Sequence, residues 1–395
     1  MRRDCNDSER EGTAMSELAT MRTDVVGSLL RPDGLKQARR RFDTGELDAD
    51  GLREVEDAAI REAVALQEGA GLGVVTDGEF RRLNFQDSFG ACVDGFRSGS
   101  ARMEILERQS HGGTALRRWD VQRDVDPQVP VWHRLPAVER LRLARNLPLE
   151  EYRFLGAATG TPAKVALVGP DRISQRFDHE NSRGVYPTMD DFLADVVAIE
   201  KAMVASLVEA GCRYVQIDAP GYTAYVDEPS VAAMRARGED PEANLERSIA
   251  ADNRIVEAFG DAVSGIHLCR GNQRSMWHRE GSYDAVAERL FSGLRHRRLL
   301  LEYDTERAGG FEPLRFVPKG TVVVLGLVST KVPELESVDF LKRRIDDAAR
   351  YLPLEQLAIS PQCGFSSDVV GNLITPDDQK RKLERVVETA RQVWG

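Results

Sequence analysis

Short runs of apolar residues recur along the chain, and most of them are nearly continuous rather than alternating with polar residues. Runs of this kind are typical of parallel β-strands that are covered on both faces, because neither side of the strand meets water. On this pattern we expect eight strands. They lie at residues 24–29, 73–77, 164–168, 214–218, 263–268, 299–303, 321–328 and 356–360.

Amphipathic segments with helical periodicity separate most of these runs. The two strongest, at 48–70 and 190–210, each end at a glycine, which commonly stops a helix at its C-terminus. Further helices are expected at 242–259, 283–294, 338–351 and 376–394. Eight strands that alternate with helices predict an α/β fold of the (β/α)8 TIM-barrel class, and an open, doubly wound sheet is the alternative.

One long stretch, residues 89–161, interrupts the alternation. It is rich in arginine and poorly periodic, which predicts an insertion after the second strand that lies over the barrel mouth rather than a separate domain. Residues 1–20 are polar, and we expect them to be a disordered lead-in to a single barrel at 21–395.

Charge and cysteine content narrow the functional classes. The 395 residues carry 54 basic and 64 acidic side chains, a net charge of −10, which disfavours non-specific binding to nucleic acid or to an anionic membrane. No apolar run approaches the roughly 20 residues that span a bilayer, and the N-terminus lacks the apolar stretch of a signal peptide. Five scattered cysteines, an odd number, favour reduced thiols in the cytoplasm over a disulfide framework.

Polar residues gather where the predicted strands end, which is where the active sites of TIM barrels form. Side chains two residues apart on a strand share a face, so His267 and Cys269 project together. With Glu302 and Cys363 at two further strand ends, they offer an imidazole, a carboxylate and two thiolates, a donor set that suits Zn²⁺. A buried thiol beside a hydrogen-bonded histidine is the alternative interpretation.

Seven motifs in order resemble the catalytic barrel of the cobalamin-independent methionine synthase family. They are DVVGSLLRP, VVTDGEFRR, AGCRYVQIDAP, GIHLCRGN, LLEYDTERAGGFEPLRF, VVLGLVSTK and ISPQCGF. The resemblance runs from about residue 23 to the C-terminus, and it is strongest to the short, single-barrel members of that family.

The resemblance implies the roles of eight residues. The zinc ligands of the family fall on His267, Cys269, Glu302 and Cys363, and its homocysteine site falls on Gly27, Ser28, Glu79 and Asp218. Carboxylates can hold an α-ammonium group, and a hydroxyl with backbone N–H groups can hold an α-carboxylate. Coordination to Zn²⁺ removes the proton of a thiol, which is mostly protonated at neutral pH when it is free. The implied reaction is therefore alkyl transfer to an activated sulfur.

Three departures from the family pattern lie on the side of the methyl donor. The segment after the seventh strand lacks the histidine thought to protonate the folate leaving group, which leaves Thr330 and Lys331 as substitutes. A surface or anion-binding cation is the alternative role for Lys331. The family's stacking tryptophan is absent, and Phe177 is expected to stack weakly in its place, while Arg172 or Arg176 would either bind an anionic donor or be a solvated loop residue. The glutamate of Q-I-D-E-P is replaced by Ala219.

Together, the residues and the resemblance predict a zinc-dependent S-methyltransferase. It would make methionine from homocysteine, with methyl-tetrahydrofolate or a methyl-corrinoid as donor. The first alternative is a zinc-dependent alkyltransferase or lyase acting on another thiol or C–S bond, similar to epoxyalkane:coenzyme M transferase; a sulfonate thiol would favour arginines over Glu79 and Asp218. The second alternative is a non-enzymatic zinc-binding or thiol-sequestering protein, whose zinc site would be closed by four protein ligands.

Overall fold

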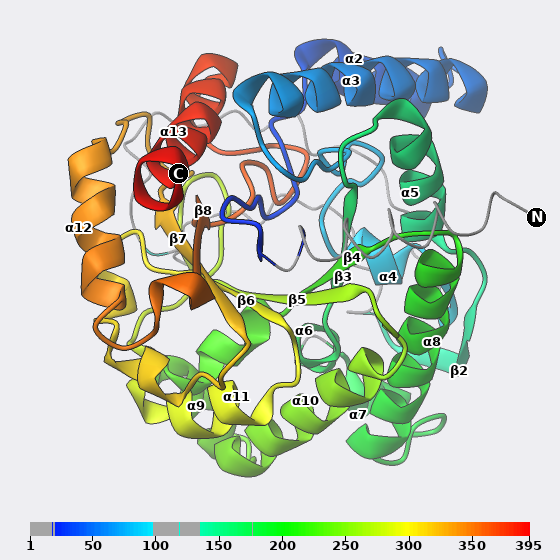
Figure 1. Ribbon diagram of the computed structural model, residues 1–395. Coiled ribbons are helices and arrows are strands. Elements are labelled where there is room, and N and C mark those ends of the chain that lie inside the picture. The colour runs from blue at the N-terminus through cyan, green and yellow to red at the C-terminus, as the bar shows by residue number, and fades with distance from the viewer. Residues whose placement is uncertain (1–17, 19, 98–117, 119–134, 176) are drawn as a thin grey trace, which may run out of the picture.

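Six parallel strands form the central sheet, and they follow one another in chain order (Figure 1). The computed structural model describes residues 18, 20–97, 118, 135–175 and 177–395. The strands are β3 (Lys164–Val168), β4 (Tyr214–Asp218), β5 (Val263–Leu268), β6 (Arg298–Glu302), β7 (Val322–Val328) and β8 (Leu357–Pro361). The six predicted strands from 164 onward are confirmed to within two residues at each end.

The two predicted strands at 24–29 and 73–77 are each reduced to a single bridge, and these bridges continue the barrel beyond the edges of the sheet. Thr23 pairs in parallel with Ile359 of β8, and Val75 pairs in parallel with Ala163 just before β3. The two segments contact each other, because the Thr76 hydroxyl donates to the Gly27 carbonyl at 2.6 Å. The fold is therefore a TIM barrel of the α/β class, as predicted, with its first two strands shortened.

Side chains inside the barrel explain why the first segment does not form a full strand. The carbonyl of Val25 accepts from Lys164 Nζ, and the carbonyl of Val26 accepts from Gln216 Nε2. The N–H of Val25 donates to its neighbour Asp24 at 2.9 Å. Backbone groups that would form a strand ladder are thus satisfied by side chains instead.

Helices surround the sheet, as Figure 1 shows. They are α2 (Asp33–Asp43), α3 (Ala49–Ala70), α4 (Asp87–Gly90), α5 (Leu147–Ala158), α6 (Pro170–Ser174), α7 (His179–Ser182), α8 (Met189–Glu209), α9 (Glu228–Ala236), α10 (Pro241–Val256), α11 (Ala287–Gly293), α12 (Val338–Ala348) and α13 (Pro376–Trp394). Short 3₁₀ turns η2 to η6 cover Pro220–Tyr225, Tyr283–Ala285, Glu306–Ala308, Glu312–Phe316 and Leu354–Gln356. Of the helices described, none is long and apolar enough to cross a membrane.

Local sequence signals account for the ends of the long helices. Thr188 and Thr375 begin α8 and α13 with capping boxes, in which the threonine and an aspartate three residues later satisfy each other's backbone N–H groups. Helix α3 ends at Gly71, whose φ of 86° is the left-handed conformation that glycine adopts without steric cost.

The predicted insertion at 89–161 contains elements of its own. Strands β1 (Val93–Phe96) and β2 (Ala137–Leu143) pair in antiparallel fashion, and α5 follows them and leads into β3. Residues 98–117 and 119–134, and most of the expected lead-in at 1–20, lie outside the described residues. Arg118 is described, and it bridges in parallel to Trp277 and donates to Asp227 at 3.0 Å. The middle of the insertion thus reaches the loop that follows β5.

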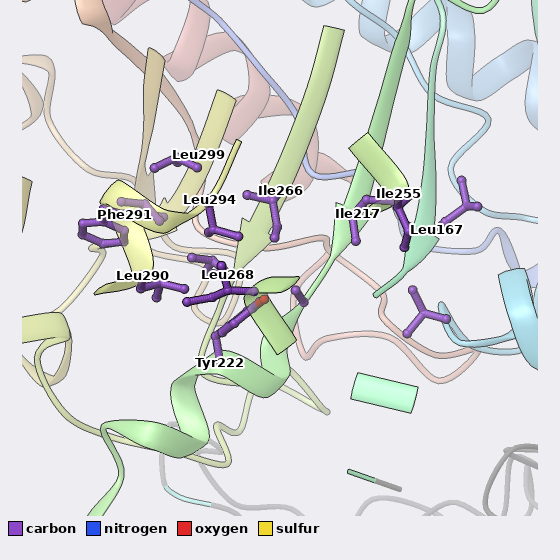
Figure 2. Close-up of a cluster of buried hydrophobic side chains, with 14 of the residues drawn as sticks. Leu167, Ile217, Tyr222, Ile255, Ile266, Leu268, Leu290, Phe291, Leu294 and Leu299 are labelled. Atoms are coloured by element: carbon purple, nitrogen blue, oxygen red, sulfur yellow. The ribbon is translucent and has the colours of Figure 1, made fainter. Parts of the chain in front are cut away.

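The alternation of side chains along the strands separates the core from the site. Ile217 of β4 and Ile266 and Leu268 of β5 belong to one buried apolar cluster with side chains of α10 and α11 (Figure 2). There they pack against a helical layer that includes Ile255 and Phe291, and all five side chains are fully buried. Residues at the intervening positions, such as Asp218 and His267, must then face the interior of the barrel.

A buried network of charges fills the end of the barrel where the strands begin. Lys164 Nζ contacts Asp24 Oδ1 at 2.7 Å, while Tyr214 OH and Arg298 Nε donate to Asp24 Oδ2 at 2.7 and 3.2 Å. Burial alone would raise the pKa of Asp24, but Lys164 and Arg298 outweigh it and the pKa is lowered. The charged Asp24 therefore joins the N-terminal segment to β3, β4 and β6.

Two helices of the outer layer enclose a pair of buried acids. Glu200 of α8 and Asp252 of α10 are fully buried, and only Asp252 has a hydrogen-bond donor among the described side chains, the hydroxyl of Tyr222. Burial raises the pKa of Asp252 to about 8, and burial together with Asp252 raises the pKa of Glu200 well above its ordinary value. Burial therefore favours the protonated form of both groups, and Asp252 keeps its proton at neutral pH.

This pair predicts that the fold loses stability as the pH rises. The native state keeps the proton of Asp252 up to about pH 8, whereas the unfolded chain releases it near pH 4, so the free energy of unfolding falls between these values. Asp252→Asn mimics the protonated acid and should remove part of this fall, on the order of a few kcal/mol. Urea denaturation of both proteins at pH 5 and pH 8.5 measures it. Equal pH slopes for the two proteins would contradict the prediction.

Candidate active site

The carboxyl ends of the strands meet at one face of the barrel and bring the candidate residues together. Asp218 of β4 is paired with His267 of β5 in the parallel register, so their side chains emerge side by side. Cys269 follows two residues later on the same face, and Cys363 lies two residues past the end of β8. The geometry confirms that residues far apart in the sequence converge here.

Three of the four predicted metal ligands form a compact cluster. The ligand atoms of His267, Cys269 and Cys363 all lie within 4.8 Å of one another, and all three side chains are buried. Within the described chain, neither ring nitrogen of His267 has a hydrogen-bond partner. Buried polar atoms are rarely left without partners in proteins, so these nitrogens indicate a missing ligand. Two thiols and an imidazole fit Zn²⁺.

The electrostatics of the cluster favour a thiolate before any ion is bound. The pKa of Cys269 lies well below its ordinary value, chiefly because the Cys363 thiol donates to its sulfur and also because His267 is close. The same interaction raises the pKa of Cys363. Burial would lower the pKa of His267, but the neighbouring Cys269 thiolate raises it instead. Without an ion, the raised pKa values favour a proton on Cys363 and on His267. A metal ion would displace these protons on binding.

Glu302, the fourth predicted ligand, lies at the same face but outside the three-residue cluster. Its Oε2 accepts from the backbone N–H of Arg270 at 2.7 Å, and its Oε1 is bonded to the guanidinium of Arg307. Burial would raise the pKa of Glu302, but Arg307, Lys331 and Arg270 lower it to about 2. The carboxylate is therefore charged and held at the rim of the cluster, and its role as a ligand stays a prediction.

Glu79 is buried and interacts electrostatically with Asp218, the register neighbour of His267, and its backbone conformation is unusual. Its φ of 59° is left-handed, which a residue with a Cβ adopts at a cost of roughly 1 kcal/mol. Two contacts hold it there: Asp77 Oδ1 accepts its N–H at 2.8 Å, and Arg31 donates to its carbonyl at 2.9 Å. A Cβ on Gly27 would lie 2.8 Å from Glu79 Oε1, so only glycine leaves room for this carboxyl group.

The two buried acids of this region, Glu79 and Asp218, differ in their hydrogen bonds. Burial raises the pKa of Glu79 to about 8, Arg82 opposes this rise, and Asp218 adds to it. Burial likewise raises the pKa of Asp218, although His267 opposes it. Glu79 Oε2 has no partner in the described part of the chain, whereas Asp218 Oδ1 accepts from Gln216 at 2.7 Å. A cationic ligand would restore the negative charge that burial disfavours.

Ser28 connects this region to the loop that carries Cys363. A Cβ on Gly364 would lie 2.0 Å from the Ser28 hydroxyl oxygen, and the Ser28 carbonyl accepts from Phe365 N at 2.8 Å. The structure thus brings Gly27, Ser28, Glu79 and Asp218 to the same face as the cluster, and their roles in substrate binding stay predictions.

Several supporting residues were not anticipated from the sequence. Asp77 and Arg31 hold the backbone of Glu79 through hydrogen bonds. Arg82 is buried and forms an ion pair with Glu151 of α5 at 2.6 Å. The neighbouring Arg81 instead pairs with Asp57 at 2.6 Å on the helix layer. The Asp-Gly-Glu turn was visible in the sequence, but the partners of Arg31 and Arg82 lie too far along the chain to be inferred from it.

The donor side contains two findings that differ from the expectations. Phe177 stacks flat on Phe192, with ring centroids 3.6 Å apart, and both rings are buried in the core. One face of the Phe177 ring is thus already occupied in the core, which does not favour the weak stacking on a donor that the sequence predicts. Arg172 and Ala219 are also buried, and Arg176 lies outside the described residues.

Thr330 and Lys331, the candidate proton donors, are buried at the end of β7, where the Thr330 hydroxyl and two of the three N–H groups of the Lys331 ammonium donate to protein acceptors. The Thr330 hydroxyl donates to Gln362 Oε1 at 2.6 Å, and Lys331 Nζ donates to Gly271 O and Asn272 Oδ1 at 3.0 and 2.9 Å. Both are close to the cluster, and their contacts are those of residues that join loops.

Comparison with known proteins agrees with the architecture of the site. The family model for the catalytic domain of cobalamin-independent synthase matches residues 21–115 and 301–391. The uncharacterized protein YxjH of Bacillus subtilis is 36% identical over 388 residues, which cover 97% of each chain. The methionine synthase of Pyrococcus abyssi is 26% identical, covering 88% of this chain and 87% of its own. The chain belongs to the cobalamin-independent methionine synthase family.

A solved structure supports the same assignment. The putative vitamin-B12 independent methionine synthase from Listeria monocytogenes superposes with a TM-score of 0.70 at 26% identity, covering 94% of this chain and 97% of its own. Family membership supports a methyltransferase.

The contact between Asp77 and Glu79 predicts a measurable role in binding. Asp77→Ala removes the acceptor that holds the left-handed backbone of Glu79 and should weaken the affinity for homocysteine about tenfold, or about 1.4 kcal/mol. Asp77→Asn keeps the acceptor and should bind more tightly than the alanine variant. Calorimetric titration measures the affinities, with Asp57→Ala as the control outside the pocket. Identical affinities for Asp77→Ala and Asp57→Ala would rule this role out.

Proposed function

We propose that the protein is a zinc-dependent S-methyltransferase that methylates the thiol of homocysteine to give methionine. The observation that carries the proposal is a single juxtaposition. A buried cluster of two thiols and an imidazole adjoins a pocket of acids, because His267 and Asp218 are register neighbours. An amino-acid thiol has a sulfur atom that suits the metal cluster and an ammonium group that suits the acids.

In this proposal, one set of residues binds the metal ion and another set binds the substrate. His267, Cys269 and Cys363, with Glu302 as the fourth ligand, would hold the ion. Zinc, when bound there, lowers the pKa of a coordinated thiol so that the sulfur is nucleophilic at neutral pH. Glu79 and Asp218 bind the α-ammonium group and orient the substrate. The Ser28 hydroxyl and nearby backbone N–H groups bind the α-carboxylate.

Arginine placement favours an amino-acid thiol over a sulfonate thiol such as coenzyme M. Arg82 is bound to Glu151 through Nε and Nη2, and Arg31 donates to the carbonyl groups of Ser366 and Glu79. Both guanidinium groups thus use most of their N–H donors on protein acceptors, although Arg31 Nε and Arg82 Nη1, like Glu79 Oε2, have no partner among the described residues. The alternative of a different thiol or C–S bond is correspondingly weaker.

The methyl donor is methyl-tetrahydrofolate or a methyl-corrinoid, and the burial of Phe177 favours the corrinoid. A pteridine ring would find no stacking support from Phe177, which is already paired with Phe192. Thr330 and Lys331 are the remaining candidates for protonating a folate amine, and both donate to protein acceptors. A corrinoid leaving group does not require that proton.

The proposal also places the protein in the cytoplasm. The four cysteines among the described residues are buried free thiols, and two of them belong to the candidate metal centre. Thiol ligands of this kind need a reducing compartment to stay available for a metal ion.

Turnover tests the reaction directly. The zinc-loaded protein is incubated with homocysteine and either methyl-tetrahydrofolate or methylcobalamin, and methionine is measured. We expect methionine from at least one donor, with methylcobalamin the better of the two. If neither donor yields methionine while homocysteine still perturbs the spectrum of a cobalt-substituted centre, the acceptor assignment holds and the alternative alkyl transfer takes its place.

Removal of one thiolate tests the metal centre. Cys363→Ser should lower the bound zinc to a small fraction of one ion per chain and abolish turnover, because serine is a poor zinc ligand. Cys212→Ser, in which the hydroxyl can still donate to the Tyr214 carbonyl at the far end of the barrel, should keep both. Zinc content is measured by atomic emission. Full turnover by a zinc-free Cys363→Ser protein would refute the mechanism.

A further inference from the structure

One side chain joins the two loops that carry the cysteines. Asn272 lies three residues after Cys269, and its Nδ2 donates to the carbonyl of Gly364 at 2.7 Å. Gly364 follows Cys363 directly. Asn272 is itself buried, with 7% of its surface exposed. The contact therefore ties the loop after β5 to the loop after β8, close to both sulfur atoms.

Two residues that follow the end of β7, Thr330 and Lys331, also contact these two loops. Lys331 Nζ donates to Asn272 Oδ1 at 2.9 Å and to Gly271 O at 3.0 Å. The preceding residue, Thr330, donates to the side chain of Gln362, which adjoins Cys363. Asn272 is thus held by Lys331 on its oxygen while its nitrogen holds Gly364.

We infer that Asn272 and Lys331 are positioning residues of the metal centre, which keep the two cysteine loops at coordinating distance before an ion is bound. This inference rests on the proposed zinc site and extends it to residues that touch neither metal nor substrate. Two loops that far apart in the sequence would otherwise lose conformational freedom when an ion joined them. We call the contacts of Asn272 with Gly364 and Lys331 the bracket. Because the bracket forms on folding, the loss of conformational freedom does not weaken the binding of the ion.

The two hydrogen bonds that Lys331 donates are those expected of a positioning residue, and the variants below test whether it also donates a proton. A general acid must present its proton toward the leaving group within hydrogen-bond reach. Lys331 instead donates to a backbone carbonyl and a side-chain amide of the loop after β5. Its ammonium group closes the bracket.

Zinc affinity of the full-length protein, measured by competition with a chromophoric chelator, tests the inference. Asn272→Ala should raise the zinc dissociation constant by about 10- to 100-fold, the effect of losing outer-shell support at other zinc sites. Asn253→Ala is the matched control, because Asn253 also donates to a backbone carbonyl (Gly293, 2.8 Å) and accepts a backbone N–H (Arg295, 2.9 Å), but on the outer helices. It should bind zinc as the wild type does.

Melting temperatures of the metal-free proteins separate positioning from general damage. Asn272→Ala and Asn253→Ala should lower the metal-free melting temperature by similar amounts, while only Asn272→Ala loses zinc affinity. Equal zinc affinity in the two variants would overturn the inference.

Lysine variants provide a second, independent measurement. Lys331→Met should weaken zinc binding by a similar factor, Lys331→Arg should restore most of it, and Lys331→Met with Asn272→Ala should add little further loss, because both changes break one bracket. Lys382→Met, at another buried lysine that donates to a backbone carbonyl, is the control. A Lys331→Met protein that keeps its zinc affinity but loses the basic limb of its pH–rate profile would identify Lys331 as a proton donor and overturn its positioning role.

The wild-type protein distinguishes failure of this inference from failure of the proposed function. If the wild type binds no zinc, the proposed function fails first. If the wild type binds zinc tightly and Asn272→Ala binds it equally well, the proposed function survives and only the bracket is refuted.

Discussion

The parallel register of neighbouring strands is the constraint on which the site depends. Because Asp218 of β4 is paired with His267 of β5, the acid proposed to bind substrate and the imidazole proposed to bind the metal are neighbours. A slip of one residue would turn His267 outward into the layer now occupied by Ile266 and Leu268. The apolar packing of those residues against the helices therefore fixes the position of the chemistry on the opposite face.

The two ends of the barrel treat buried charge in opposite ways. At the end where the strands begin, Asp24 is matched by Lys164, Arg298 and Tyr214, so its charge is satisfied within the protein. At the mouth, His267 and Glu79 retain polar atoms that no described residue satisfies. Unsatisfied buried groups cost stability, and a ligand that completes them recovers that cost as binding energy.

Support for the site comes from residues that hold backbone rather than bind ligand. Asp77 stabilises the left-handed turn at Glu79, and Asn272 ties together the cysteine loops. Arg307 and the Arg270 backbone hold Glu302 at the rim.

Much of the fold follows from the sequence alone, because continuous apolar runs indicate buried strands. The candidate metal cluster follows as well, because polar residues at the ends of these strands lie at the mouth of the barrel. His267 and Cys269 could be paired by their spacing of two, and six strands are where the runs lie. Contacts between distant segments were decided only by the tertiary structure. Phe177 lies against Phe192 rather than at the donor side, and Lys331 bonds to Asn272 rather than to a leaving group. A local pattern records which face of an element is buried, but the partner across the interface is chosen by packing and hydrogen bonding between parts of the chain that no short-range periodicity relates.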